Sequence, residues 1–280
     1  MIFQVTNGCS WNNCTFCDMY TQPQKKFRAR NEAEVLAEIK NAAAVGPRFE
    51  KVFLADGDAF VLPTRRLETI LQQIRESLPW VKRVGAYCLP RNIRKKSADD
   101  LRRLKELGLG IAYVGAESGD DDVLTAISKG ETYDSTLNAL NKLKEAGIAS
   151  SVMVLNGMGG RSLSTQHAIN TARLMNEAQP EFLSTLVVSY PLGQERVVQG
   201  FTEAGFDYEL PDQHELFVEL RTFIDTLDLR DTVFRSDHAS NYLPLKGTLG
   251  ADKQALLSQL DTAINRPDSI RLRQEWQRGL

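Results

Sequence analysis

Residues 111–155, IAYVGAESGDDDVLTAISKGETYDSTLNALNKLKEAGIASSVMVL, contain one complete strand–helix–strand unit. The apolar runs Ile111–Gly115 and Ser151–Leu155 are typical of buried strands, and the apolar spacing over Tyr133–Ala146 predicts a helix between them. Gly147 follows the last residue of that pattern, where glycine commonly ends a helix. This order of elements predicts two parallel strands joined by a right-handed crossover.

The same alternation extends from the first residue to about position 190. The other expected strands are Ile2–Thr6, Lys51–Ala55, Arg83–Cys88 and Leu183–Val188, and the other expected helices are Glu32–Ala44, Leu67–Leu78, Ala98–Leu107 and Ser164–Ala178. Six strand–helix repeats predict a parallel sheet. Because the strand segments are strongly apolar, we expect the sheet to be covered on both faces.

Polar or glycine-rich segments follow nearly every expected strand. These segments are Asn7–Cys17, Asp56–Asp58, Pro90–Asn92, Glu117–Gly119, Asn156–Gly160 and Tyr190–Gly193. In a barrel the loops after all strands meet at one mouth, whereas an open doubly wound sheet uses mainly its switch point. We therefore expect an α/β fold: a partial (β/α)6 TIM-like barrel over residues 1–195, with a short mixed C-terminal extension over residues 196–280 that caps it.

Composition narrows the class of protein. Of the 280 residues 42% are hydrophobic and 25% charged, which are ordinary globular values and exclude a disordered or fibrous chain. The formal net charge of -2 makes a nucleic-acid partner unexpected. No run approaches the roughly 20 apolar residues of a membrane span, and the N-terminus lacks a secretory signal pattern. We expect a cytoplasmic protein with no membrane partner.

Three of the four cysteines are clustered, in the segment Cys9-Ser-Trp-Asn-Asn-Cys14-Thr-Phe-Cys17, while Cys88 stands alone. Three thiolates this close can bind three irons of a [4Fe–4S] cluster, which leaves the fourth iron open to a substrate or cofactor. Two alternatives remain. One is a zinc site completed by a histidine or Cys88, although the second cysteine pair of most zinc sites is missing. The other is an iron–sulfur electron carrier or sensor with Cys88 as the fourth ligand.

The cysteine loop, with an aromatic residue before its last cysteine, resembles that of the radical S-adenosylmethionine (SAM) enzymes. Their usual first gap has three residues, and here it has four. The string Gly115-Ala-Glu117-Ser118-Gly119 resembles a motif of the branch that includes the oxygen-independent coproporphyrinogen oxidases. The resemblance covers roughly residues 1–195.

This resemblance implies an oxidoreductase with a [4Fe–4S] cluster and SAM as cofactors, and it assigns Cys9, Cys14 and Cys17 as the catalytic metal ligands. It implies reductive cleavage of SAM to a 5′-deoxyadenosyl radical, which abstracts hydrogen from a substrate. A reductase such as flavodoxin or ferredoxin is the implied protein partner. Since no second cysteine cluster follows and the C-terminal region is short, we expect a small organic substrate.

The resemblance also places residues at SAM. Phe16 would lie beside the adenine, Asp56-Gly57-Asp58 resembles the Gly-Gly-Glu motif that holds the ammonium group, and the loops after the later strands would contact the ribose, methionine or adenine. The residues expected at SAM are Phe16, Asp56, Gly57, Asp58, Glu117, Ser118, Asn156, Gly157 and Tyr190. Each also occurs in ordinary turns and caps, so these assignments depend on the cysteine loop.

Three further segments carry open interpretations. Arg91 is a candidate partner for an anionic substrate group. Asp237-His238 could transfer a proton or could belong to a structured loop that caps the barrel. Beyond a helix from Pro211 to about Leu227 and a final helix over Asp252–Ile264, the charged stretch Arg266–Leu280 is expected to be a surface tail.

Overall fold

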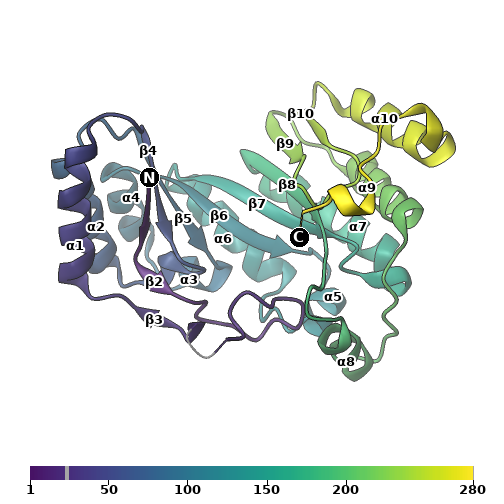
Figure 1. The fold of residues 1–280 in the computed structure, drawn as a ribbon, viewed down its shortest axis with the longest axis horizontal. Helices are drawn as coiled ribbons and strands as arrows, with labels where there is room; N and C mark the ends of the chain where they lie inside the picture. The colour runs from purple at the N-terminus through teal and green to yellow at the C-terminus, as the bar shows by residue number, and fades with distance from the viewer. Residues whose placement is uncertain (23–24, 280) are drawn as a thin grey trace. The chain divides into compact units, whose positions relative to one another are not determined.

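The computed structural model describes residues 1–22 and 25–279. They form an α/β fold with a mostly parallel sheet, as the strand–helix alternation predicts. The chain divides into two compact units. The first contains residues 1–12, 19–115 and 138–151, and the second contains residues 13–18, 116–137 and 152–280. Figure 1 shows their elements.

The first unit is built on parallel strands. Its elements are β1 (Ile2–Gln4), β2 (Thr6–Asn7), β3 (Arg28–Ala29), α1 (Glu32–Ala42), η2 (Ala43–Val45), β4 (Lys51–Ala55), η3 (Ala59–Val61), α2 (Thr64–Ser77), β5 (Arg83–Cys88), α3 (Pro90–Arg94), α4 (Ala98–Glu106) and most of β6 (Leu109–Glu117). It also includes the end of α6 (Tyr133–Glu145) and the start of β7 (Ala149–Asn156). The strand order is β1-β4-β5-β6-β7, and the pairs β1–β4, β4–β5 and β5–β6 are all parallel.

Local sequence signals explain the helices of this unit. The Ser97 hydroxyl accepts a hydrogen bond from Asp100 N while the Asp100 carboxylate accepts one from Ser97 N, a reciprocal capping box at the start of α4. Gly108, with φ of +106°, ends α4 in a conformation that favours glycine. Helices α1 and α2 pack side by side (Figure 1), and α2 buries one stripe at helical spacing: Leu67, Ile70, Leu71 and Ile74.

The second unit carries the later strands and the C-terminal region. Its elements are the end of β6, α5 (Asp121–Ala126), the start of α6, the rest of β7, α7 (Gly160–Ala178), β8 (Phe182–Val187), α8 (Glu195–Glu203), α9 (Gln213–Thr226), β9 (Thr232–Ser236), β10 (Leu245–Leu249), α10 (Lys253–Asn265), η4 (Pro267–Ser269) and η5 (Glu275–Gln277). The strand order is β7-β8-β9-β10, with β9 parallel to β8 and β10 antiparallel to β9.

Acidic caps begin two helices of this unit. The Asp120 carboxylate accepts from Val123 N at 3.0 Å at the start of α5, so the acidic residues 120–122 form the N-terminus of this helix. Asp212 and Glu215 form a capping box at the start of α9. Helix α9 then packs between α7 and α10 (Figure 1).

Strands β4, β7 and β8 are fully buried on only one face, so the prediction that both faces are covered is wrong for them, whereas β5 and β6 each contain consecutive fully buried residues. Strands β7 and β8 alternate strictly between half-buried and fully buried residues, and β4 shows the same period. In a partial barrel the helices cover the outer face, whereas the inner face lines the barrel interior. Because the half-buried residues on that inner face are also largely apolar, the sequences of these strands do not alternate between apolar and polar residues.

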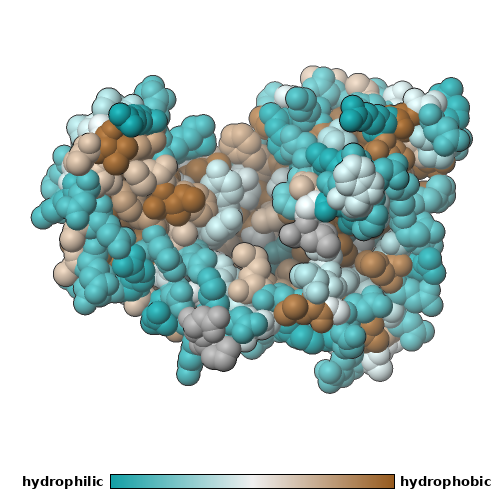
Figure 2. Space-filling view, viewed as in Figure 1, coloured by the Kyte–Doolittle hydropathy of each residue, from teal (hydrophilic) through white to brown (hydrophobic). Residues whose placement is uncertain are grey.

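The surface of the protein is mainly hydrophilic, and the C-terminal residues are held against it. Figure 2 shows a mainly hydrophilic face with scattered hydrophobic residues; Ile2, Met19, Leu192 and Trp276 are each more than 60% exposed. Residues 266–279 lie at the surface, as predicted for the tail, and they are anchored there because Arg273 donates to the carbonyls of His238 and Asn241. Within the described ranges, no helix has the length and apolar character to cross a membrane.

Candidate functional site

In the first unit, the loop after β4 contacts Gly8 and Tyr20, which flank the three clustered cysteines in the sequence. The Asp56 carboxylate accepts from Gly8 N at 3.3 Å and from the Tyr20 hydroxyl at 2.9 Å. A Cβ on Gly57 would collide with the Tyr20 ring, so glycine is needed for this close approach. Asp56 and Gly57, expected at the SAM ammonium group, thus lie directly against the cysteine loop.

Asp58 is fully buried and binds the residue next to Cys9. Its carboxylate accepts hydrogen bonds from the Ser10 hydroxyl and the Asn92 amide. Burial raises the pKa of Asp58 to about 6, against the opposing effect of those hydrogen bonds and of the nearby cations Arg91 and Lys96. Lys96 is itself buried and donates to Leu62 O at 2.8 Å. The sequence analysis named the segment Pro90–Asn92 but gave neither Asn92 nor Ser10 a role, because an isolated amide or hydroxyl carries no motif.

The buried carboxyl of Asp58 gives a testable pH dependence. Its pKa is higher in the folded protein than the usual 3.8, so its contribution to stability is present below about pH 4 and is lost as the pH rises through about 6. The difference of about 2 pKa units corresponds to about 3 kcal/mol. We expect Asp58→Asn to unfold at higher urea concentration than wild type at pH 8, with the advantage shrinking towards pH 4.

Urea titrations of both proteins between pH 4 and 8 measure this effect. The amide can accept from Asn92 and donate to the Ser10 hydroxyl, because a hydroxyl serves as either donor or acceptor. Asn92→Ala is the comparison variant, since it removes one partner and keeps the carboxyl. A stability difference between wild type and Asp58→Asn that does not change with pH would contradict the assigned pKa.

Arg91 and Cys88 also have defined surroundings in the first unit. The Arg91 guanidinium carbon lies 3.8 Å from the centroid of the Trp11 ring, so this side chain stacks on the cysteine loop. Cys88 is 2% exposed and its thiol donates to Leu89 O at 3.3 Å. Cys9, Cys14 and Cys17 are partly exposed, and none of the four cysteines forms a disulfide.

In the second unit, one arginine that the sequence analysis missed holds the backbone of the other two clustered cysteines. Arg196, in α8, donates to Cys14 O at 2.8 Å and to Cys17 O at 3.2 Å, and it pairs with Asp18 at 3.0 Å. Cys17 N also donates to Cys14 O at 3.4 Å. Because these bonds use backbone groups, the thiols take no part in them. Within the described ranges, no three His, Cys, Asp or Glu side chains form a ready-made metal site.

Glu117 ends β6 in a buried ion pair. Its carboxylate lies 2.8 Å from the Lys129 ammonium, with both side chains at most 10% exposed. The Lys129 ammonium also lies 5.9 Å from the centre of the Phe16 ring, so Phe16 and Glu117, both expected at SAM, contact the same lysine. Glu117 has φ of +63°, a conformation uncommon outside glycine and often found at functional sites.

Ser118 connects this turn to a buried histidine. Its hydroxyl lies 2.8 Å from His167 Nδ1, and His167 Nε2 lies 3.1 Å from Leu155 O, in β7. The carbonyl only accepts, so Nε2 carries a proton. His167 therefore joins the turn after β6 to the end of β7.

A carboxylate from the C-terminal region holds the glycine-rich loop after β7. Glu219, in α9, is 3% exposed and accepts from Gly157 N and from the Ser164 hydroxyl, each at 2.6 Å. Burial raises the pKa of Glu219, opposed by nearby His167 and by these two donors. Gly157 has φ of +87°, and a Cβ there would lie 2.7 Å from Leu216 Cδ2, so only glycine fits.

The remaining predicted residues of this unit lie around the same loop. The Asn156 amide donates to Leu216 O at 3.2 Å. The hydroxyls of Tyr190 and Tyr208 are 2.6 Å apart, and Tyr208 donates to Gly157 O at 3.3 Å. Burial raises the pKa of both tyrosines, so they are neutral at physiological pH. Lys129, His167, Glu219 and Tyr208 thus contact five of the predicted residues: Phe16, Glu117, Ser118, Gly157 and Tyr190. The sixth, Asn156, is held by Leu216 O.

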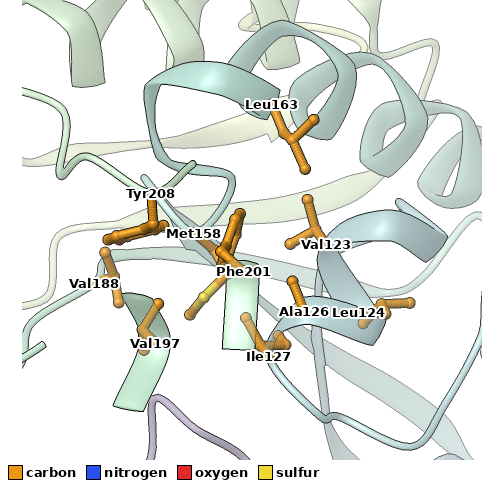
Figure 3. Packing of buried hydrophobic residues seen from close by; sticks show 10 residues of the cluster. All are labelled: Val123, Leu124, Ala126, Ile127, Met158, Leu163, Val188, Val197, Phe201 and Tyr208. Atoms are coloured by element: carbon orange, nitrogen blue, oxygen red, sulfur yellow. The ribbon is translucent and has the colours of Figure 1, made fainter. Parts of the chain in front are cut away.

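This arrangement rests on an apolar cluster beneath the loop (Figure 3). Met158 is fully buried and belongs to one cluster with Phe201 of α8 and Ile127 after α5. Phe16 and Tyr190 pack at the margin of the cluster. Gly200 allows α8 to approach closely, because a Cβ there would collide with Ala126 O. The loops that carry the predicted residues are therefore fixed by packing as well as by hydrogen bonds.

Comparison with known proteins gives the family. The model for the "Radical SAM superfamily" matches residues 3–175. The chain belongs to the radical SAM superfamily. Members of this superfamily are enzymes whose cofactors are a [4Fe–4S] cluster and SAM, which confirms the predicted class and cofactors.

Individual radical SAM relatives are distant. The heme chaperone HemW of Bacillus subtilis (strain 168) is 24% identical over 182 residues, covering 62% of this chain and 47% of HemW. The coproporphyrinogen III oxidase HemN of Escherichia coli, described as a radical SAM enzyme, has a TM-score of 0.59 at 15% identity, covering 80% of this chain and 51% of HemN. The chain spans half or less of the length of the curated relatives it matches.

A second radical SAM structure shows the fold with its cluster. The methyltransferase TsrM of Kitasatospora setae, solved with cobalamin and a [4Fe–4S] cluster bound, has a TM-score of 0.51 at 21% identity, covering 66% of this chain and 33% of TsrM. At these identities the likeness concerns the fold alone. The donor set of this chain fits the cluster, since three partly exposed thiols belong to one segment.

Proposed function

We propose that this radical SAM enzyme holds a [4Fe–4S] cluster by Cys9, Cys14 and Cys17 and acts on a small organic substrate that is still to be identified. The observation that carries the ligand assignment is the contrast in exposure: these three thiols are partly exposed, whereas Cys88 is buried and donates to a backbone carbonyl. When bound, the cluster and SAM supply a reductive cleavage that yields methionine and a 5′-deoxyadenosyl radical, which abstracts hydrogen from the substrate.

The chain's own residues then bind and orient the cluster and SAM, and they exclude water from them. Arg196 fixes the carbonyls of Cys14 and Cys17, and so presents their thiols in one orientation. The carboxylates of Asp56 and Asp58 hold the residues on either side of Cys9, because they accept from Gly8 N and from the Ser10 hydroxyl. These contacts support a positioning role for both carboxylates, and they leave the backbone of the loop after β4 as the group to receive the SAM ammonium.

Glu117, Ser118, Asn156, Gly157, Phe16 and Tyr190 are proposed to bind the remainder of SAM. The support is that Lys129, His167, Glu219 and Tyr208 contact five of these residues, while the Asn156 amide donates to Leu216 O. In this proposal the barrel is formed by residues 1–195, and the extension over residues 196–280 contributes Glu219, which fixes the loop at Gly157. A flavodoxin or ferredoxin type of reductase is the proposed electron donor.

Anaerobic reconstitution tests this function directly. We expect about four irons per chain and, after reduction with dithionite and addition of SAM, formation of 5′-deoxyadenosine measured by chromatography. Protein reconstituted identically and left unreduced is the control. Fully loaded, reduced protein that forms no 5′-deoxyadenosine, alone or with extracts containing small molecules, would contradict the proposal.

A further inference from the structure

The half-exposed sheet face of the second unit carries two adjacent cations. Arg235 of β9 and Lys246 of β10 are direct cross-strand neighbours in the antiparallel pair, and both are exposed. Side chains opposite each other in such a pair lie on one face with Cβ atoms about 5 Å apart. Ser184 of β8 flanks Arg235 on its other side, in parallel register.

Among the residues that the structure describes, neither cation forms an ion pair. The other residues on this face of the strands within the second unit are Met153, Leu155, Phe182, Ser184, Leu186, Val233 and Thr248, none of which is acidic. Asp237, which follows β9, forms no ion pair with either cation among the described residues, and the Arg235 guanidinium donates to Phe234 O at 2.9 Å. Like charges directly opposite are destabilising, so an anion between them would relieve the repulsion.

An edge lysine alone has a simpler explanation, because lysines on edge strands discourage pairing with other chains. Strand β10 is the edge of this sheet, but β9 lies inside it, between β8 and β10. The arginine on β9 therefore needs another reason. Guanidinium groups suit carboxylates and phosphates, which they bind through two parallel hydrogen bonds.

The position of Arg235 and Lys246 along the strands matches the place where barrel enzymes bind their substrates. Strands β8 and β9 are parallel, and Arg235 is the fourth of five residues of β9, so it lies towards the carboxyl ends of these strands, where barrel enzymes bind substrates. Apolar side chains continue the face from this point: Leu186 follows Ser184 at the next position on β8, and the Ser184 hydroxyl donates to Val152 O, beside Met153, at 3.4 Å.

We propose that Arg235 and Lys246 bind an anionic group of the substrate, a carboxylate or a phosphate, while an apolar part of the same molecule lies against Met153 and Leu186. This inference rests on the proposed function, because it assigns the chemical class of the substrate to that enzyme. It predicts a small amphipathic anion and disfavours cationic or fully neutral substrates.

Matched ligands test the proposal on cluster-loaded protein without SAM or reductant. Octanoate, octyl phosphate and 1-octanol share an apolar chain and differ in the head group. We expect calorimetry to show at least one anion binding about tenfold more tightly than 1-octanol, the size of effect of one charge-assisted hydrogen bond. The better anion identifies the head group as carboxylate or phosphate.

Variants then locate the site. We expect Arg235→Gln and Lys246→Gln each to weaken anion binding about fivefold to tenfold, and the double variant to abolish the preference over 1-octanol. Arg173→Gln, an exposed arginine on α7, is the matched control and should bind as wild type. Equal binding of the anions and 1-octanol to wild type, or an anion preference retained in the double variant, overturns the proposal.

The result is separable from that of the proposed function. Lost anion preference with intact 5′-deoxyadenosine formation overturns only this inference. Anion binding that depends on Arg235 and Lys246, in a fully loaded protein that cannot cleave SAM, supports the site and overturns the radical chemistry.

Discussion

The Cys14→Ala variant is expected to lose SAM cleavage, whereas Cys88→Ala is expected to retain it. Outer-shell partners of metal ligands are worth about 10–100-fold, and a direct ligand more, so activity should fall by more than about 100-fold in Cys14→Ala. Arg196 binds the carbonyl of Cys14, which an alanine keeps, so the substitution removes the ligand while the loop keeps this anchor. Iron content and 5′-deoxyadenosine yield measure both effects.

Cys88→Ala separates the enzyme from an electron carrier with four cysteine ligands. Removing this small buried side chain costs about 1 kcal/mol through lost packing, and it leaves the three clustered thiols intact. Cluster content and SAM cleavage equal to wild type are the expected results. Loss of the cluster in Cys88→Ala, with a thermal midpoint close to that of wild type, would instead support Cys88 as the fourth ligand.

The Lys129→Met variant is expected to lose about 3–5 kcal/mol of unfolding free energy, because it leaves Glu117 buried without its partner. Replacing both members of such a pair with apolar residues of similar volume is often neutral, so Glu117→Met/Lys129→Met should recover most of that loss. SAM binding should remain lost in the double variant, because Glu117 is the proposed contact. Urea unfolding and equilibrium dialysis with SAM measure the two properties.

A control variant distinguishes the loss of this ion pair from a general folding defect. Lys142 donates to Ile93 O in α3 and to Lys96 O just after that helix. Lys142→Met serves as the control, because no carboxylate becomes isolated. The double variant of Glu117 and Lys129 binding SAM as tightly as wild type would exclude Glu117 from the SAM site. A Lys129→Met protein as stable as wild type would contradict the buried pair itself.

The strands were largely predictable because each carries its own apolar run between turn residues. Lys51–Ala55 and Arg83–Cys88 have the predicted bounds. The strand Leu245–Leu249 was missed, since glycine and lysine interrupt its apolar residues and only pairing with β9 makes it a strand. Helix α8 was missed because Gly200 disfavours a helix, whereas in the folded chain that glycine permits close approach to Ala126.

By itself, the sequence determined the α/β class, the three clustered cysteines and the motif at Glu117, because local spacing and backbone preference act over a few residues. Only the tertiary structure decided which isolated charged or polar side chains support the cysteine loop, the turn at Glu117 and the loop at Gly157: Arg196, Lys129, His167 and Glu219. In the sequence each resembles a solvated residue. Burial and the partner that folding brings within hydrogen-bond distance give each one its role.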